Sequence, residues 1–300
     1  MKYLLMALSV TLASLNSIVL RKFKSRTFST PGDSFFFNGG LSLVWCAIML
    51  VWFFAAGDKS VSALAIIFGA VYGAILCLFL YFKNQSIATG PVSLTSLIGN
   101  CAFITATWFG VIYAQERVSV FQLIGMTLIL ISLILCINPK KSAEPLCLKW
   151  FLYCLAFFGA GSLIGVFQKV FGKSQAVSEV NGMMLTASIV SCLLFFALGL
   201  IVNKVKGAKA PSIKRPALIY ILLSGITGCG YIRLNMSLAA IIPSALFFPV
   251  ANGGIVIITT LAGAFIFKEK LNKTQLLGIL LGLVAIVIVG CGEFFWNLIF

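Results

Sequence analysis

The sequence predicts an all-α, polytopic membrane protein, and three observations support this fold class. Of the 300 residues, 61% are hydrophobic and only 10% are charged, and the mean hydropathy is +1.10. A soluble domain carries about 25% charged residues, so this chain is built for a different solvent. Apolar runs recur along the whole length, and each is long enough to cross roughly 30 Å of hydrocarbon.

Ten membrane spans are expected, joined by short connections. They cover residues 3–20, 34–56, 62–82, 91–112, 119–138, 148–168, 181–202, 217–240, 244–267 and 274–292. The first span has the length of a signal peptide. It is nevertheless expected to be retained, because a basic cluster at 21–26 follows it without a small-x-small cleavage pattern.

The second half of the chain repeats the first. Glu116 and Glu269 are 153 positions apart, and other pairs follow in the same order with an offset that changes slowly along the chain. The pairs are Arg21 with Lys169, Tyr81 with Tyr231, Lys83 with Arg233, Pro91 with Pro243, Asn100 with Asn252, Gln122 with Gln275, and Gly125 with Gly278. Such a series predicts an internal duplication. The two copies, 1–142 and 143–300, are expected to form one integrated membrane domain.

Each copy holds five expected spans, and this odd number inserts the second copy upside-down relative to the first. The predicted fold is therefore two inverted five-helix repeats, as in many secondary transporters. Of the 22 Lys and Arg residues, 16 lie in the connections on one side of the membrane and 6 lie on the other. The positive-inside rule then places both termini on the non-cytoplasmic face.

The charge pattern excludes several classes of protein. The net charge of +15 comes from basic residues in the connections between apolar runs, so it does not indicate a nucleic-acid partner. The chain has no histidine, and its nine cysteines lack metal-type spacing, so no metal or other cofactor is expected. All seven acidic residues fall in connections or at span ends. This argues against a proton-coupled exporter of lipophilic cations.

Two basic residues lie in a pattern that occurs in both copies. Lys83 follows Tyr81 as Tyr-x-Lys, and Arg233 follows Tyr231 as Tyr-x-Arg. One interpretation is that each charge ends a helix and extends into the lipid headgroups. The other is that the two charges form cationic rims at opposite ends of one pathway, which would favour an anionic or carboxylate-bearing solute. The four residues are candidate substrate-binding residues.

Asn100 and Asn252 are the main candidate polar pair inside the membrane, because each lies about ten residues into its span. An amide without a partner there costs several kcal/mol, so it must bond another helix, water or substrate. Helix–helix contact and pathway lining both stay open. Gly253 lies in a small-residue patch beside Asn252. Asn16 and Asn235 complete the set of candidate substrate-binding residues.

The acidic residues Glu116 and Glu269 stand at the elbows before the last span of each copy. Each precedes a basic residue at the N-terminal side of a helix, where a carboxylate suits the helix dipole. A role in fixing the elbow is favoured over a role in gating. Arg21 and Lys169 are expected to extend their charges from helix ends into the headgroups.

At these elbows the chain resembles a known family. Glu116-Arg117-Val118-x3-Gln122-Leu123-Ile124-Gly125 and Glu269-Lys270-Leu271-x3-Gln275-Leu276-Leu277-Gly278 resemble the boundary between the fourth and fifth helices of EamA-type, ten-helix members of the drug/metabolite transporter superfamily. The resemblance covers essentially the whole chain. It implies alternating access, with helices one to four and six to nine around a central cavity and helices five and ten peripheral.

The resemblance has limits at particular residues. The family often has a proline near the position of Asn100-Cys101-Ala102, and the first span lacks the acidic residue of the small four-helix multidrug members. Drug–proton antiport is therefore not carried over, and no substrate residue is transferred. Family members move amino acids, nucleotides and sugars, organic anions, or drugs.

The sequence thus predicts a secondary transporter of a small metabolite, with an amino acid or an organic anion as the favoured cargo. A multidrug exporter and a non-transporting scaffold or lipid-binding protein are the alternatives. An enzyme is not expected, because the sequence lacks the histidines and paired intramembrane aspartates of proton-handling sites. The expected partners are a small-molecule substrate and the lipid bilayer. A homodimer stays open, and the expected location is a bacterial inner membrane.

Overall fold

The computed structural model describes residues 1–23, 32–57, 60–90, 92–136, 147–207, 215–266, 268 and 272–292, and all regular elements in these ranges are helices. The helices are α1 (Lys2–Lys22), α2 (Asp33–Ala55), α3 (Ala63–Thr89), α4 (Val92–Asn100), α5 (Ala102–Ala114), α6 (Val120–Cys136), α7 (Leu148–Gly172), the 3₁₀ turn η3 (Gln175–Glu179), α8 (Val180–Val205), α9 (Arg215–Ile241), α10 (Ser244–Phe265) and α11 (Lys273–Gly290).

The protein is an all-helical, multi-pass membrane protein. Nine helical spans within the described ranges are long and apolar enough to cross a bilayer, and the apolar helix α6, with 17 residues, is shorter. Large apolar side chains stand exposed on the outward helix faces, among them Phe54 at 69%, Val205 at 79% and Phe265 at 81%. An apolar exterior of this extent is what a lipid-facing surface requires.

The predicted span 91–112 was wrong in one respect, because it is two helices rather than one. A turn at Cys101 separates α4 from α5. The Cys101 amide still bonds the Leu97 carbonyl at 2.9 Å, but the next hydrogen bond runs only three residues, from the Ile104 amide to the Cys101 carbonyl at 3.0 Å. A tightened turn, with no proline among residues 92–112, therefore breaks the helix. The other expected spans correspond to one helix each.

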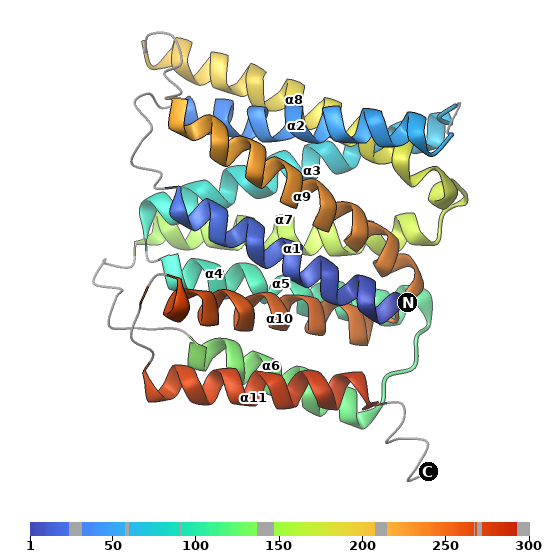
Figure 1. Ribbon diagram of the computed structural model, residues 1–300, viewed down its shortest axis with the longest axis vertical. Helices are drawn as coiled ribbons and strands as arrows, with labels where there is room; N and C mark the ends of the chain where they lie inside the picture. Colours follow the sequence, from blue (N-terminus) through green and yellow to red (C-terminus); the bar gives the residue numbers. More distant parts are fainter. Residues whose placement is uncertain are drawn as a thin grey trace.

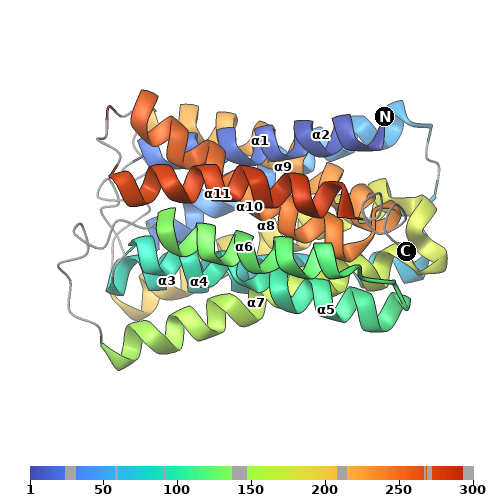
Figure 2. The same cartoon turned by 90° about the horizontal axis from the view of Figure 1, so that it is seen from below.

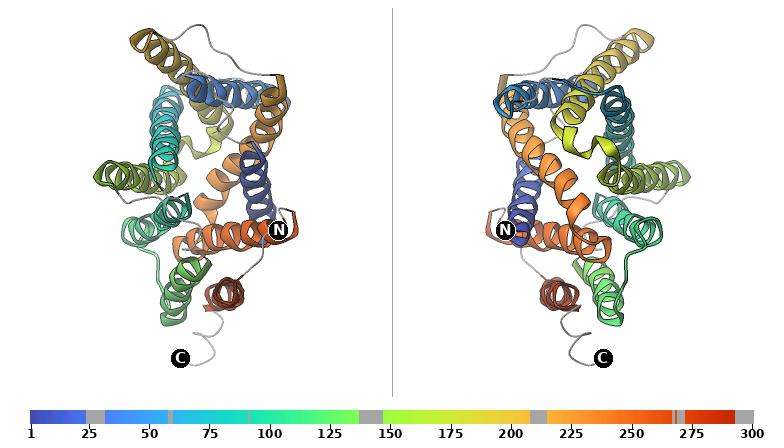
Figure 3. Two further views of the ribbon diagram at one scale, coloured as in Figure 1. Left: turned by 90° about the vertical axis from the view of Figure 1, so that its left-hand side faces the viewer. Right: turned by 90° about the vertical axis from the view of Figure 1, so that its right-hand side faces the viewer.

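The helices lie roughly along one direction, and α1 begins on the side of the bundle where α11 ends (Figures 1 and 2). The α6–α11 pair occupies one end of the long axis of the molecule, and α2 and α8 occupy the other (Figures 1 and 3). The α6–α11 pair therefore lies at the periphery.

Helices of the first half pack mainly on helices of the second half. α2 packs on α8 and α9, α3 on α7 and α8, α1 on α9 and α10, α5 on α7 and α10, and α6 on α11. In the described part of the chain the two halves are consequently interleaved, and each apolar cluster contains residues of both.

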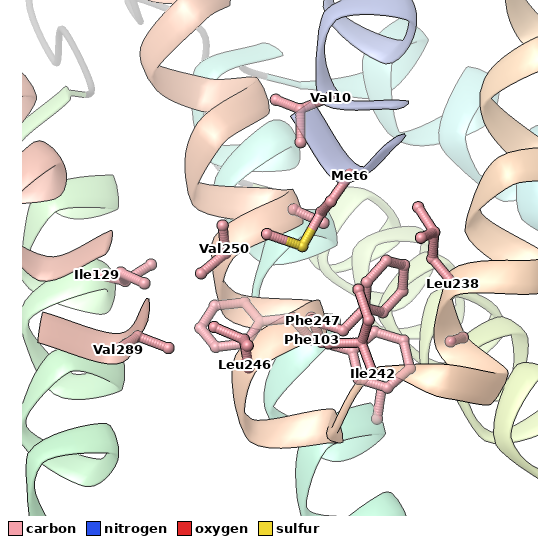
Figure 4. Packing of buried hydrophobic residues seen from close by; sticks show 14 of the residues in the cluster. Met6, Val10, Phe103, Ile129, Leu238, Ile242, Leu246, Phe247, Val250 and Val289 are labelled. Atoms are coloured by element: carbon pink, nitrogen blue, oxygen red, sulfur yellow. The ribbon is translucent and has the colours of Figure 1, made fainter. Parts of the chain in front are cut away.

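Two apolar clusters hold the interleaved helices together. The larger one joins α1, α5, α6, α9, α10 and α11, with Met6, Leu246 and Val250 among its side chains (Figure 4). The second joins α3, α7, α8 and α9, and in it the ring of Tyr72 stacks on that of Phe167 at 4.8 Å. Because lipid is as apolar as these side chains, close packing rather than water exclusion stabilises the contacts.

Candidate functional site

The described residues of the two elbows before α6 and α11 share two features. Gln115 and Lys268 both adopt the left-handed conformation, with φ of 52° at each. Two glutamines then bond back to the residue that precedes their helix: Gln122 Oε1 accepts from the Ser119 amide at 2.9 Å, and Gln275 Oε1 accepts from the Asn272 amide at 3.0 Å. Each pair caps the N-terminus of its helix. Glu269, Lys270 and Pro91 lie outside the described residues.

At the first elbow, Glu116 is the centre of a buried polar network. Its Oε1 pairs with Lys169 Nζ of α7 at 3.0 Å, and its Oε2 accepts from the Ser244 amide at the N-terminus of α10 at 2.5 Å. Lys169 Nζ also donates to the Ile242 carbonyl at 2.9 Å. The carboxylate therefore satisfies one of the amides that the start of α10 leaves without a helical partner.

The expectation that Lys169 extends into the headgroups was wrong. Its side chain is only 4% exposed and points into the protein, toward Glu116. A buried lysine without its anion would carry a large desolvation cost, and Glu116 offsets that cost. The sequence predicted that both residues lie near helix ends. It did not predict that Glu116 and Lys169 contact each other, because they are 53 positions apart in the chain.

Arg233 of α9 contacts the start of α8 through its side chain. Its Nε donates to Asn181 Oδ1 at 3.0 Å, and one terminal nitrogen donates to the hydroxyl of Ser237, one turn further along α9. Asn181 is buried. The Arg233 side chain is therefore held by α8 and α9. Neither Asn181 nor Ser237 was a predicted site residue, although both are polar positions inside predicted spans.

Lys83 differs from Arg233 in its surroundings. It lies on the same face of α3 as Phe79 and Ser86, and the residue is half-buried. Within the described part of the chain, no hydrogen bond or ion pair engages Lys83. Both cations lie in the last third of their helices, and α3 and α9 run in opposite directions (Figure 1). Lys83 and Arg233 thus lie toward opposite ends of the bundle, as the repeat predicts.

Asn16 and Asn235 join α1 to α9. Asn16 Nδ2 donates to the Ser224 carbonyl at 2.8 Å and to Thr227 Oγ1 at 3.2 Å, and Ser9 Oγ donates to Asn235 Oδ1 at 2.5 Å. Buried polar groups in lipid require partners of this kind. Both asparagines therefore act as contacts between helices in this structure. Ser9 was missed, because a single serine in an apolar span carries no distinctive signal.

The remaining asparagines lie in different surroundings. Asn252 Nδ2 donates to the Phe248 carbonyl of its own helix at 2.9 Å. Gly253, beside it, faces Ile129 of α6, whose Cγ2 would lie 3.3 Å from an added Cβ. Asn100 is the last residue of α4, directly before the break at Cys101. The Gly253 position is thus a close contact between α10 and α6.

The two tyrosines of the repeated pattern pack into the bundle. The ring of Tyr81 stacks on that of Phe35 in α2 at 5.7 Å, and the Tyr231 side chain packs against the second apolar cluster. Hydrogen bonds of Asn16 and Asn235 therefore connect α1 with α9, and a hydrogen bond of Arg233 connects α9 with α8.

Comparisons with known proteins give the fold and nothing more specific. No family model matches the chain, and no curated protein matches it. A solved structure described only as "Crystal structure of protein" is similar, with a TM-score of 0.75 and 12% sequence identity over 96% of this chain and 95% of that one. The chain thus shares its whole helical arrangement with a protein of very different sequence.

Proposed function

We propose that this protein is a secondary transporter that moves a small metabolite across the membrane by alternating access. In this proposal the fold is a ten-helix inverted repeat, in which α4 and α5 together form one span. The observation that carries the proposal is that helices of the first half pack mainly on helices of the second half. The paired helices, α1 with α7, α2 with α8, α3 with α9, α4–α5 with α10, and α6 with α11, run in opposite directions (Figure 1).

The contacts between helices also come in matching pairs when each helix is replaced by its counterpart in the other half. The contact of α3 with α7 has its counterpart in α9 with α1, α5 with α7 in α10 with α1, and α3 with α8 in α9 with α2. In inverted-repeat transporters, the site lies between such halves, and rocking of one against the other exposes it alternately on each side. The matched elbows at Gln115 and Lys268 support the same duplication.

The cargo class in this proposal is an amino acid or an organic anion. Lys83 supports it as a half-buried cation toward one end of the bundle, which no described residue engages by a hydrogen bond or ion pair. Within the described spans, carboxylates lie at helix ends, at Asp33, Glu116 and Glu179, where they do not offer a mid-membrane site for a cation. The proposed family is the EamA-type group of drug/metabolite transporters, and the proposed location is a bacterial inner membrane.

The first test is thermal unfolding of the detergent-purified protein with neutral amino acids, organic anions, nucleotides and quaternary cations. A ligand that binds only the folded state stabilises it by ~2.7 kcal/mol at a hundred times its dissociation constant. The ligand that raises the melting temperature is then tested for counterflow in proteoliposomes. Saturable exchange of an amino acid or organic anion is the expected result.

Two other outcomes correspond to the alternative functions. Stabilisation by quaternary cations alone would replace the anionic cargo with drug export. Stabilisation without saturable flux in either direction would indicate a scaffold or lipid-binding protein. Proteoliposomes with Asn16→Ala are compared with wild type, because this variant removes the hydrogen bonds that Asn16 donates to Ser224 and Thr227 of α9.

A further inference from the structure

Several hydrogen-bond donors lie close together near the middle of the helices, where α9 packs on both α1 and α2. α9 lies between these two helices (Figure 1). Gly228 is the central residue of α9, and Trp45 lies close to the centre of α2. An added Cβ at Gly228 would lie 3.1 Å from Trp45 Nε1 and 3.2 Å from Asn16 Nδ2. Side chains from α1 and α2 therefore meet over Gly228.

Two of the donors in this region lack an acceptor. Within the described residues, neither the indole nitrogen of Trp45 nor the hydroxyl of Ser224 has a hydrogen-bond partner, and both atoms are buried. Ser224 lies one turn before Gly228 on the same face of α9 and is only 1% exposed. Because an unpaired polar group inside a membrane protein is costly, two of them close to one glycine require an explanation.

The hydroxyl of Ser224 does not use the partner that its own helix offers. Hydroxyls in helices commonly donate to a carbonyl one turn back, as Thr227 does to the Leu223 carbonyl at 2.7 Å. The Ser224 hydroxyl makes no such bond among the described residues, while the Ser224 carbonyl accepts from Asn16 Nδ2 at 2.8 Å. Asn16 is thus a positioning residue that holds α1 against α9, and the Ser224 hydroxyl is left to donate elsewhere.

The unpaired donors match the chemistry of an oxygen acceptor. An indole N–H can only donate, and a serine hydroxyl donates through one proton. Hydrogen bonds of this kind are stronger when the acceptor is a carboxylate than when it is neutral. Trp45 belongs to the first half of the chain and Ser224 to the second. In inverted-repeat transporters the substrate site lies at the bilayer midplane, between the two halves.

We propose that Trp45 Nε1 and Ser224 Oγ bind a carboxylate oxygen of the transported metabolite, and that Gly228 lets this oxygen approach because it has no side chain. Both donor atoms are buried in this structure, so the oxygen reaches them when α2 and α9 move apart. This inference rests on the proposed transport function. It adds where along the pathway the carboxylate is held, and by which groups.

The first test observes the Trp45 indole directly, through ¹H–¹⁵N resonances of the full-length protein labelled with ¹⁵N-tryptophan in detergent micelles. Trp45→Phe identifies the resonance. The probes are L-alanine, L-glutamate and succinate, and L-alaninamide is the control without a carboxylate. We expect at least one of the three carboxylates to move the Trp45 resonance downfield, because a hydrogen bond deshields the indole proton. The resonance of Trp52, which is 51% exposed, should stay in place.

The second test measures the dissociation constant of the same carboxylate by isothermal titration calorimetry. Trp45→Phe keeps an aromatic ring and removes the N–H, so it is expected to weaken binding by about tenfold or more. Trp52→Phe is the matched control on the same helix and should bind as wild type does. Ser224→Ala removes a neutral donor and is expected to weaken binding by about threefold to tenfold.

A pair of glycine variants tests the approach of the oxygen. Gly228→Ala is expected to weaken binding at least about tenfold, because its Cβ would occupy the position between Trp45 Nε1 and Asn16 Nδ2. Gly230→Ala is the control on α9, since its added Cβ meets Leu12 of α1, at 3.0 Å, and lies away from Trp45. Binding by Gly230→Ala should match wild type. Equal binding by Gly228→Ala would contradict the site.

The outcomes separate this site from the transport function. A carboxylate that binds without moving the Trp45 resonance, or that binds Trp45→Phe as tightly as wild type, would contradict the site and leave transport in place. An equal shift by L-alaninamide would contradict a carboxylate site. A shift and a loss of affinity in Trp45→Phe, without flux in proteoliposomes, would support the site and contradict transport. Binding of none of the three carboxylates would contradict both the site and the cargo class.

Discussion

Gln115 and Lys268 share one unusual backbone conformation, with φ of 52° at both, although they lie in different halves of the chain. Each directly precedes the glutamate of an elbow. A left-handed conformation is unfavourable for any residue with a Cβ, and two copies of it at matching positions indicate that the elbow geometry is required. At Gln115 it ends α5, with its amide on the Val111 carbonyl.

Gln115→Gly and Lys268→Gly are expected to raise stability, each by about 0.5–1 kcal/mol, because glycine adopts this conformation without a steric cost. Gln115→Val and Lys268→Val are expected to lower it by at least about 1 kcal/mol, because a β-branched residue fits it worst. Thermal unfolding in detergent measures all four variants. Equal melting temperatures for the Gly and Val variants would show that the elbow relaxes easily.

Gly278 allows α11 to lie directly against α6. A Cβ added there would meet Leu135 Cβ at 2.9 Å and the Cys136 amide nitrogen at 3.0 Å, while the Gly278 carbonyl accepts from Ser132 Oγ at 2.7 Å. Gly278→Ala is expected to cost about 1–3 kcal/mol, since the helices must separate. Gly159→Ala in α7 is the control, because an added Cβ there meets nothing within 4 Å. A neutral Gly278→Ala would contradict close packing of this pair.

The contact between Ser9 and Asn235 is expected to stabilise the α1–α9 pair by a small, measurable amount. A double-mutant cycle with Ser9→Ala and Asn235→Ala should give a coupling free energy of about 0.6 kcal/mol, and at most about 1.7 kcal/mol, as for other hydrogen bonds between membrane helices. Unfolding in mixed micelles provides the four free energies. The affinity for the ligand found in the thermal-unfolding panel should stay unchanged in Asn235→Ala. A large loss of affinity would instead indicate that Asn235 binds the substrate.

Periodicity and composition were enough to predict the helices, because a span requires only a long apolar run. The duplication was equally visible, since Glu116, Gln122 and Gly125 recur in order as Glu269, Gln275 and Gly278. The break at Cys101 was not predictable in this way. No proline marks it, and a change from four-residue to three-residue hydrogen bonds leaves no trace in hydropathy.

The contacts of the polar residues were harder to predict than their positions. Asn16 and Asn252 look alike in the sequence, yet the amide of one bonds α9 and that of the other bonds its own helix. Likewise, Lys169 and Arg21 occupy matching positions but differ in burial. Which partner a polar group finds depends on how distant helices cross, and a pattern within one span does not contain that information.

Lys83 and Arg233 allow a direct comparison between a proposed binding residue and a residue that other side chains hold in place. Arg233→Gln is expected to lower the free energy of unfolding by about 1–3 kcal/mol, because Asn181 Oδ1 loses a charged donor. Lys83→Gln is expected to leave stability unchanged or to raise it, because it removes a half-buried cation that no described residue engages.

The effect of ligand on the melting temperature should show the reverse order of the two variants, with Lys83→Gln impaired and Arg233→Gln not. With an anionic ligand present, wild-type protein and Arg233→Gln are expected to gain melting temperature, and Lys83→Gln is expected to lose most of that gain. Lys83→Arg is the control, because it keeps the positive charge and should keep a response. If Lys83→Gln instead lowers the melting temperature without ligand as much as Arg233→Gln does, Lys83 is a structural residue and the anionic cargo loses its main support.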